Sequence, residues 1–262
     1  MVSSIPAEGD SPGELTVNHF MHTILKPVFA SLLFTSIAFL QVTGEVDEIL
    51  DRHYEALGGL ENLGRLETLS IKGVNRFQEQ EISVRYLAKR PNLLRMDSES
   101  PEIKVVRVFD GERAWQAIKQ PGAPKQVTEM EGQEAVELVR ESDFDGPLVD
   151  YKEKGHEIAF LGRETVQDRE AYKLTLVEER GARETYYIDA ESYQVVKKAA
   201  DVSTRTGEIL FEMYYDDFRE VDGLMFPFET AVYSDGETVF TGVIEEVEVN
   251  PDLDGELFER PR

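Results

Sequence analysis

The chain has 262 residues, of which 41% are hydrophobic and 31% charged, and its formal net charge at pH 7 is −24. This apolar content is enough for one sizeable core, and the mixed distribution of charge does not indicate disorder. A surface this acidic repels nucleic-acid phosphates and anionic lipid head groups. The absence of cysteine excludes disulfides, thiol nucleophiles, cysteine-based zinc sites and lipid attachment to an N-terminal cysteine.

An uncharged apolar run lies near the N-terminus. Residues 28–40 (VFASLLFTSIAFL) follow Lys26 and precede small residues at 42–44 (VTG). A run of this length matches the hydrophobic region of a signal peptide and falls short of the ~20 residues that span a bilayer. We therefore predict that residues 1–44 contain a cleavable export signal, with an uncleaved membrane anchor as the alternative.

The segment before this run is unlike the start of a signal peptide. Residues 1–20 are acidic and contain prolines and glycines, whereas such a start is ordinarily basic. Translation beginning at Met21 would give a more typical signal, so residues 1–20 are interpreted as an upstream extension. We expect residues 45–262 to form a single domain.

The predicted domain opens with a helical pattern. In residues 45–57 (EVDEILDRHYEAL), apolar side chains recur three or four positions apart and form one stripe. Gly58 and Gly59 follow, and glycine in this place commonly ends a helix. We predict an amphipathic helix over residues 45–57.

From Leu66 onward, apolar and polar residues alternate, which indicates strands. Strands are expected at residues 67–77, 80–89, 92–99, 102–109, 112–118, 156–165, 170–180, 183–189, 194–202, 208–218, 225–234 and 236–249. Pro91, Pro101 and Asp-Gly pairs such as that at 110–111 mark turns between them. The alternation stops at residues 127–143 (VTEMEGQEAVELVRESD), where the pattern predicts an acidic amphipathic helix.

Roughly twelve strands joined mostly by tight turns favour an antiparallel meander, because parallel pairing needs long crossovers. Several strands have large apolar side chains on one face, among them Phe211, Met213 and Phe228. A single curved sheet must bury such a face, and two short helices are too small to fill it. A ligand cavity is one interpretation, and a core filled by the aromatic side chains is the other.

Two motifs lie about twenty residues apart in the first half of this domain. Lys-Arg-Pro-Asn-Leu stands at 89–93, and Asp-Gly-Glu-Arg-Ala-Trp stands at 110–115. This pair resembles the periplasmic lipoprotein-carrier family typified by LolA, with LolB as a relative. Other segments resemble the broader group of outer-membrane lipoprotein-sorting proteins: 53–59 (HYEALGG), 187–189 (YID), 221–227 (VDGLMFP) and 257–261 (LFERP). Together they extend over almost all of residues 45–262.

The resemblance implies a mainly β fold, in which a single curved antiparallel sheet forms an unclosed barrel of about eleven strands with a helical lid. It also implies a periplasmic carrier or chaperone that binds the acyl chains of a lipoprotein, or another hydrophobic ligand, in the barrel cavity. Such a carrier sorts its ligand toward the outer membrane with the help of inner- and outer-membrane transfer partners. We expect a monomer with no cofactor, no bound metal and no nucleic-acid partner.

The resemblance also assigns residues to the site. The arginine of the Lys-Arg-Pro motif corresponds to Arg90, which is associated with holding the lid through hydrogen bonds to helix and loop carbonyls. The guanidinium fork suits this role because its donors can reach several oxygens at once, and an ordinary edge-strand residue is the alternative. The residues expected to line the cavity are Leu94, Met96, Phe109, Trp115, Phe211, Met213, Tyr215, Phe226 and Phe228.

No catalytic constellation is recognisable. His53 and His156 are the two histidines of the predicted domain, and two isolated histidines match no zinc or nucleophile motif. Carboxylate pairs arise by chance in so acidic a chain, so they do not indicate catalysis. We therefore expect a binding protein rather than an enzyme. The competing hypothesis is a structural or regulatory binding module on the same fold that transfers no lipid.

The first testable prediction concerns the N-terminus of the exported protein. Because the apolar run at 28–40 precedes the domain and no cysteine can be lipidated, the mature protein should begin near Glu45 and need no detergent. N-terminal sequencing of protein recovered from the periplasm measures this directly. Retention of residues 28–40 in that material would contradict the cleavable signal.

Overall fold

The computed structural model describes residues 32–262 except 180 and 205–206. The chain divides into two compact units, Met1–Ala38 and Phe39–Arg262, and all the strands belong to the second. The predicted export signal and its upstream extension lie largely outside the described residues. Among the helices that are described, none combines the length and hydrophobicity needed to cross a membrane.

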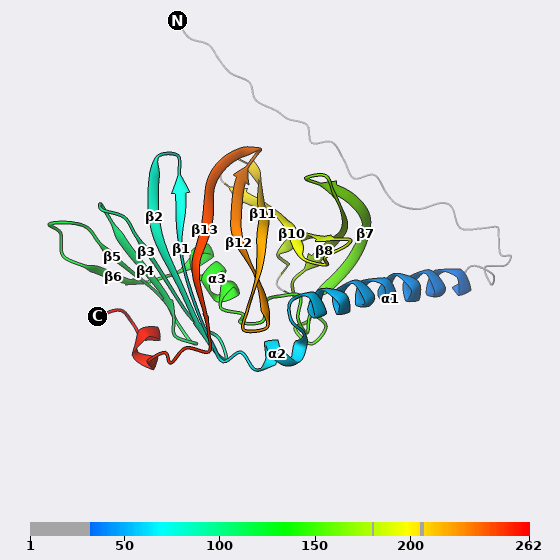
Figure 1. The fold of residues 1–262 in the computed structure, drawn as a ribbon, viewed down its shortest axis with the longest axis horizontal. Helices are drawn as coiled ribbons and strands as arrows, with labels where there is room; N and C mark the ends of the chain where they lie inside the picture. Colours follow the sequence, from blue (N-terminus) through cyan, green and yellow to red (C-terminus); the bar gives the residue numbers. More distant parts are fainter. Residues whose placement is uncertain (1–31, 180, 205–206) are drawn as a thin grey trace, which may run out of the picture. The chain divides into compact units, whose positions relative to one another are not determined.

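In the described residues, thirteen strands form one antiparallel sheet (Figure 1). The strands are β1 (Thr68–Phe77), β2 (Gln80–Lys89), β3 (Leu93–Glu99), β4 (Lys104–Phe109), β5 (Ala114–Lys119), β6 (Gln126–Glu129), β7 (Glu157–Val166), β8 (Arg169–Val177), β9 (Arg183–Asp189), β10 (Val195–Thr204), β11 (Gly207–Val221), β12 (Leu224–Ser234) and β13 (Glu237–Val249). Strands β1 to β6 form one meander and β7 to β13 form another, and the pairing of β1 with β13 joins the two. The sheet therefore ends in two edges, β6 and β7.

The predicted fold class is confirmed: the chain is mainly β, with one antiparallel sheet that does not close and few helices. Thirteen strands replace the predicted eleven or twelve. The strand that periodicity missed is β6, where Gln126 to Glu129 pair with β5. The helix that was expected to begin at residue 127 begins at Gly132 instead, because the backbone of the preceding segment has a strand edge to pair with.

In the part of the chain that the structure describes, four helical segments accompany the sheet: α1 (Leu32–Ala56), α2 (Leu60–Gly64), α3 (Gly132–Glu141) and the 3-10 turn η1 (Gly255–Phe258). The predicted helix over 45–57 is confirmed as the second half of α1. Its apolar stripe is buried at Val46, Ile49, Leu50 and Tyr54 against side chains of β8 and β9. Each fully buried aliphatic side chain of this kind stabilises the fold by about 1.5–3 kcal/mol.

One face of the sheet, called here the inner face, is covered by α1 and α3. Leu138 of α3 packs with Leu94 of β3 and Phe109 of β4, and Figure 1 shows α3 lying within the curve of the strands. Because α3 connects edge strand β6 to edge strand β7 in the sequence, the chain must cross between the two edges of the sheet. The inner face is covered at that crossing.

The opposite, outer face is covered in part by the C-terminal segment. Leu253 and Phe258 pack on Leu87 of β2, and the guanidinium of Arg260 lies 5.0 Å from the ring centre of Trp115.

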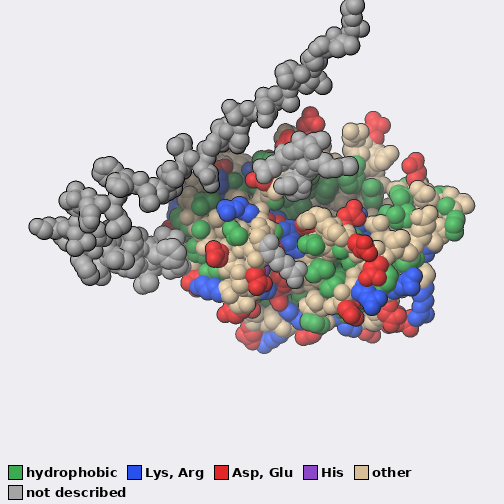
Figure 2. Space-filling view, turned by 180° about the vertical axis from the view of Figure 1, so that it is seen from behind, with side chains coloured by type: hydrophobic (Ala, Val, Ile, Leu, Met, Phe, Trp, Pro, Cys, Tyr) green, Lys and Arg blue, Asp and Glu red, His purple; other side chains and the backbone are tan. Residues whose placement is uncertain are grey.

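Figure 2 shows the molecule from behind, with Asp and Glu side chains spread among basic and hydrophobic ones over the surface in view. The acidity of the chain is thus dispersed on that face rather than gathered into one patch.

The end of α1 depends on a glycine. Gly58 has φ +112°, and a Cβ built on it would lie 2.1 Å from the carbonyl oxygen of Gly223. The amide of Met225 donates to the Leu57 carbonyl at 3.1 Å, so the helix end meets the β11–β12 turn backbone to backbone. No other residue type fits this contact without moving one of the two segments.

We predict that Gly58→Ala lowers the free energy of unfolding by about 1–3 kcal/mol, since it combines a disfavoured φ with a backbone clash. Urea denaturation followed by circular dichroism measures the change. Gly64→Ala is the matched control, because a Cβ on Gly64 meets no atom within 4 Å and its φ is not positive. Equal stability of the two variants would contradict a docked helix end.

Candidate ligand-binding site

A cavity of about 190 Å³ opens on the inner face near the centre of the sheet. Its apolar walls include Ile71, Val84, Tyr86, Met96 and Ile244, all of them partly rather than fully buried. Burial raises the pKa of Tyr86 to about 12, so its hydroxyl stays protonated at any physiological pH. The cavity surface is therefore mostly apolar, and the Tyr86 hydroxyl adds no charge to it at physiological pH.

Strand register places more apolar side chains on the inner face. Thr230, which lines the cavity, pairs with Tyr215. Alternate residues of a strand share a face, so Phe211 and Met213 of β11 lie on the inner face with Tyr215. Phe226 and Phe228 of β12 share the face of Thr230 for the same reason. Except for Phe228, which is buried, these aromatic and methionine side chains remain partly exposed.

Eight of the nine side chains predicted to line the cavity are therefore on the inner face. Leu94 and Phe109 are buried beneath α3, with Met96 packed beside them. Trp115 is the exception, since it packs with Val106 and Val108 on the outer face and its indole N–H donates to Asp110 at 2.9 Å. The structure does not bring Trp115 together with the other eight.

Arg90 connects three segments at one end of α3. Its Nε donates to the Leu66 carbonyl at 2.6 Å and its Nη2 to the Leu63 carbonyl at 3.0 Å. Both terminal nitrogens also donate to the Asp145 carboxylate, at 2.7 and 2.5 Å, and the guanidinium lies 4.6 Å from the ring centre of Phe144. The hydrogen bond to Asp145 raises the pKa of Arg90 above its ordinary value.

This geometry ties the loop after α3 to the end of α2 and to the residues between α2 and β1. The carbonyl contacts are of the kind that the resemblance implied, whereas the ion pair with Asp145 was not foreseen from the sequence. Charge-assisted hydrogen bonds contribute about 1.5–3 kcal/mol each. Arg90 is therefore placed to set the position of the loop that follows α3.

A second polar cluster lies on the inner face where α3 meets β9. The side chain of Glu184 is 1% exposed and accepts hydrogen bonds from Arg140 of α3 at 2.8 Å and from Tyr186 at 2.6 Å. Lys198 of β10 lies 2.8 Å from the same carboxylate. Burial alone would raise the pKa of Glu184, but the charge and hydrogen bond of Lys198, with help from Tyr186 and Arg140, lower it.

Sequence reasoning missed this cluster. The one available signal was the position of Glu184, two residues before Tyr186 and four before Ile188, which puts a carboxylate on the apolar face of a strand. A buried carboxylate needs cationic and hydrogen-bonding partners, and Arg140 supplies one from the helix. The residues from β6 to β7, numbers 130–156 and called here the α3 segment, are thus held at Arg90 and at Glu184.

Comparisons with known proteins bear on the fold. No family model matches the chain, and no curated protein is similar to it in sequence. The solved structure of a LolA superfamily protein from Nitrosomonas europaea superposes with a TM-score of 0.51 at 15% identity, covering 76% of this chain and 95% of that one. The chain has a LolA-like fold.

Two further solved structures agree with the LolA-like fold. A DUF1329 family protein from Desulfovibrio piger has a TM-score of 0.57 at 11% identity, with 82% of this chain and 97% of that one covered. A solved structure from Vibrio parahaemolyticus, provisionally described as an outer membrane lipoprotein-sorting protein domain, has a TM-score of 0.54 at 9% identity. The match covers 81% of this chain and 97% of that one. At these identities the likeness establishes the fold.

We predict that Arg140→Met speeds hydrogen exchange in α3, because Glu184 keeps the helix in place through this arginine. Loss of a charge-assisted hydrogen bond worth about 1.5–3 kcal/mol corresponds to roughly 10- to 100-fold faster exchange. Mass-spectrometric exchange over residues 132–141 measures it. The control is Arg65→Met, whose pair with Glu61 is mostly exposed and worth about 0–1 kcal/mol. Equal α3 exchange rates in the two variants would show that the contact between Arg140 and Glu184 does not hold α3 in place.

The same contact should respond to acid. Because the folded state lowers the pKa of Glu184, its interactions are complete above the unfolded value of about 4.3 and are lost as the pH falls through the folded value. Protection of α3 in the parent chain should therefore hold down to about pH 5 and decrease below about pH 4. In Arg140→Met this acid-dependent loss should be smaller.

Proposed function

We propose that this chain is an exported periplasmic carrier that binds the acyl chains of a lipoprotein, or another hydrophobic ligand, on the inner face of its sheet. The observation that carries the proposal is the partly exposed apolar inner face. Its residues include Met96, Phe211, Met213 and Phe226, and α3 covers one side of it. Apolar surface of this kind favours contact with an apolar ligand by about 25 cal/mol per Å².

The way in which α3 is held supports reversible opening. Only one residue of α3, Leu138, is fully buried, while polar contacts at Arg90 and Arg140 fix the two regions beside it. Moving α3 would therefore take one fully buried side chain out of its contacts and leave the packed cluster under α1 in place. A ligand could enter as the α3 segment moves, while the sheet stays intact.

The names of the structural neighbours agree with this proposal. One is described as an outer membrane lipoprotein-sorting domain and another as a LolA superfamily protein. Transfer toward the outer membrane, passage through the periplasm and a non-catalytic mode of action are inferred for this chain by analogy with them. The predicted export signal at 1–44 is consistent with that location.

The second candidate is a structural or regulatory binding module on the same fold without lipid transfer. It is favoured by the buried contacts of Leu94 and Phe109 with Leu138, which fill part of the inner face with protein. Mass spectrometry of organic extracts from protein purified out of the periplasm separates the two. A stoichiometric lipid supports the carrier, and lipid-free protein that also fails to bind an added acyl probe supports the module.

We predict that Phe211→Ala and Met213→Ala weaken binding of a fluorescent acyl probe. Each removes apolar contact worth about 1–2 kcal/mol, or roughly 5- to 30-fold in Kd. Leu210→Ala is the matched control, because Leu210 comes directly before Phe211 on the strand, faces the other way and is 38% exposed. If both inner-face variants bind the probe as the parent chain does, the carrier proposal is wrong.

We also predict that Arg90→Leu changes both the affinity for the probe and its transfer to acceptor vesicles. The change removes the donors to Leu63, Leu66 and Asp145, whose hydrogen bonds together are worth several kcal/mol. The affinity and the transfer rate should therefore both change, at least one of them by roughly tenfold or more. The control is Arg76→Leu, whose pair with Glu81 is exposed. Unchanged binding and transfer in a folded Arg90→Leu protein would remove Arg90 from the gate.

A further inference from the structure

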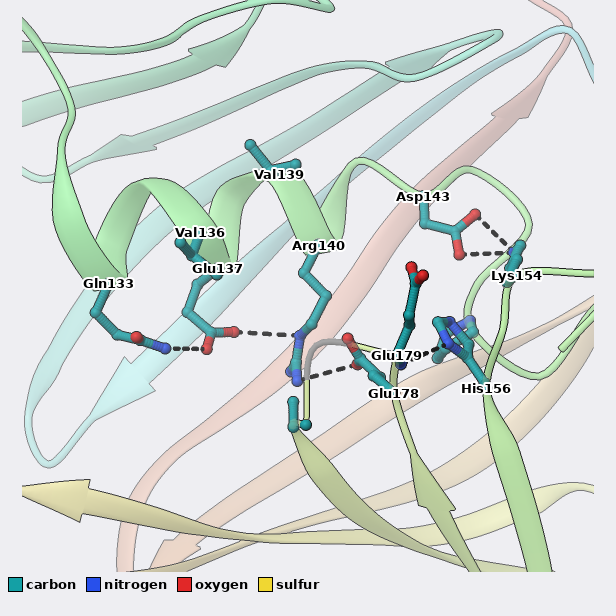
Figure 3. Close-up of a pocket in the computed structure, with 13 residues that line it drawn as sticks. Gln133, Val136, Glu137, Val139, Arg140, Asp143, Lys154, His156, Glu178 and Glu179 are labelled. Atoms are coloured by element: carbon teal, nitrogen blue, oxygen red, sulfur yellow. Dashed lines mark hydrogen bonds and ion pairs between the residues drawn. The ribbon is translucent and has the colours of Figure 1, made fainter.

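Two hollows of the molecule differ in the charge of their walls. The larger, of about 600 Å³, lies beside α3, and Figure 3 shows ion pairs in its wall, Arg140 with Glu137 and Lys154 with Asp143. The smaller is the cavity of about 190 Å³ on the inner face. The charged residues of this smaller cavity face away from it, which decides the kind of ligand that it can hold.

Two of the residues at the inner-face cavity are charged, Arg85 on β2 and Asp97 on β3. They stand directly opposite each other, and Arg85 precedes Tyr86, whose side chain is on the inner face, so both charged side chains face outward. The contacts of Asp97 agree, since it accepts from Arg95, which also donates to the Leu257 carbonyl of the C-terminal segment. Of the described lining residues, those whose side chains face the cavity are therefore all uncharged.

Gly242 of β13 lines this cavity between two polar side chains. It pairs with Asn75 of β1 on one side and with Thr230 of β12 on the other, so all three residues share the inner face. A Cβ built on Gly242 would lie 2.5 Å from Oγ1 of Thr230 and 2.8 Å from Oδ1 of Asn75. The absence of a side chain at Gly242 thus leaves a space on which both polar groups converge.

Asn75 and Thr230 are open to a ligand at this space. Both are partly buried, yet within the described residues neither side chain forms a hydrogen bond with another residue. Both can donate, because the hydroxyl rotates and half a turn of the amide exchanges its Oδ1 for its Nδ2. Polar groups shielded from water are ordinarily hydrogen-bonded, so an acceptor that enters the space meets two donors.

A carbonyl oxygen matches this arrangement. It has two lone pairs, each of which accepts a hydrogen bond, so one such oxygen above Gly242 can accept from both Asn75 and Thr230. Ile71 and Ile244 give the cavity apolar walls, which suit the carbons beside the carbonyl. A carboxylate also accepts hydrogen bonds, but moving its charge out of water among uncharged side chains is costly.

We propose that the space above Gly242 binds the carbonyl oxygen of an acyl ester, with Asn75 and Thr230 as the donors and the acyl chain along the inner face. The inference rests on the proposed function and names the class of ligand: chains joined to the rest of their molecule by an uncharged ester linkage, rather than free fatty acids. It also assigns Asn75 and Thr230 to the site, two residues that no sequence motif singles out.

The experiment compares ligands that differ in one group. Methyl decanoate, decyl methyl ether and decanoate each compete with the neutral fluorophore N-phenyl-1-naphthylamine for the full mature chain, at pH 7 and physiological salt and below their solubility limits. The ester and the ether have the same chain length and differ in the carbonyl oxygen, so the ester should displace the fluorophore at a concentration about fivefold lower. Decanoate should require a higher concentration than the ester, because its charge must leave water.

Substitutions of matched shape identify the donors. Asn75→Leu together with Thr230→Val should reduce the preference for ester over ether to about twofold or less, because both hydrogen bonds are lost while the apolar contacts remain. The control is Thr241→Val, since Thr241 is next to Gly242 on β13 and faces the other side of the sheet. It should keep the fivefold preference. Should the double variant fail to fold, Thr230→Val alone must lower the preference where Thr241→Val does not.

The outcomes separate this site from the carrier proposal. If ester and ether displace the fluorophore equally well from the parent chain, the carbonyl site is wrong and the carrier proposal stands. The same conclusion follows if the preference survives in the double variant, or if Thr241→Val lowers it equally. Displacement by decanoate at the concentration that the ester needs would overturn the selection of an uncharged linkage. If neither ester nor ether displaces the fluorophore, the proposed function fails and the carbonyl site with it.

Discussion

The inner face of an open thirteen-stranded sheet must be covered, and the rest of this structure depends on how that is done. Edge strands β6 and β7 are consecutive in the sequence but lie at opposite ends of the sheet, so the α3 segment has to cross between them. Leu138 anchors that crossing on the side of β3 and β4, and Arg140 anchors it at β9. The connection of the chain itself therefore supplies the cover, with no need for a separate domain.

The charges beside α3 specify its position more than they stabilise the fold. Burying an ion pair removes both ions from water, and this cost offsets most of the attraction, whereas removing one partner leaves a buried charge without compensation. Glu184 lies buried with Arg140, Lys198 and Tyr186 around it. If α3 moved away from the sheet, Arg140 would leave while Glu184 stayed buried, so partial displacement of α3 is unfavourable. The position of α3 on the sheet is therefore set by these polar contacts together with the one side chain that it buries fully, Leu138.

Alternation and turn residues predict the antiparallel sheet because they act between neighbours in the sequence. The face on which a side chain lies depends in addition on register, and Trp115 shows this. Phe109 pairs with Ala114 across the β4–β5 turn, so Trp115 stands opposite Val108 and cannot share the face of Phe109. The motif that contains Trp115 carries no sign of this. Likewise, the segment 126–129 has a strand partner only once β5 is in place, and Asp145 meets Arg90 only through folding.

Different parts of the chain cover the two faces of the sheet. On the outer face, the chain's own C-terminal segment covers apolar side chains: Leu253 and Phe258 lie on Leu87, and Arg260 lies over Trp115. On the inner face, α1 packs apolar side chains on β8 and β9, whereas α3 adds one fully buried side chain over β3 and β4, and a cavity remains nearer the centre of the sheet. Leaving apolar surface open to water on the inner face is unfavourable, which is expected where another molecule is to supply the missing contacts.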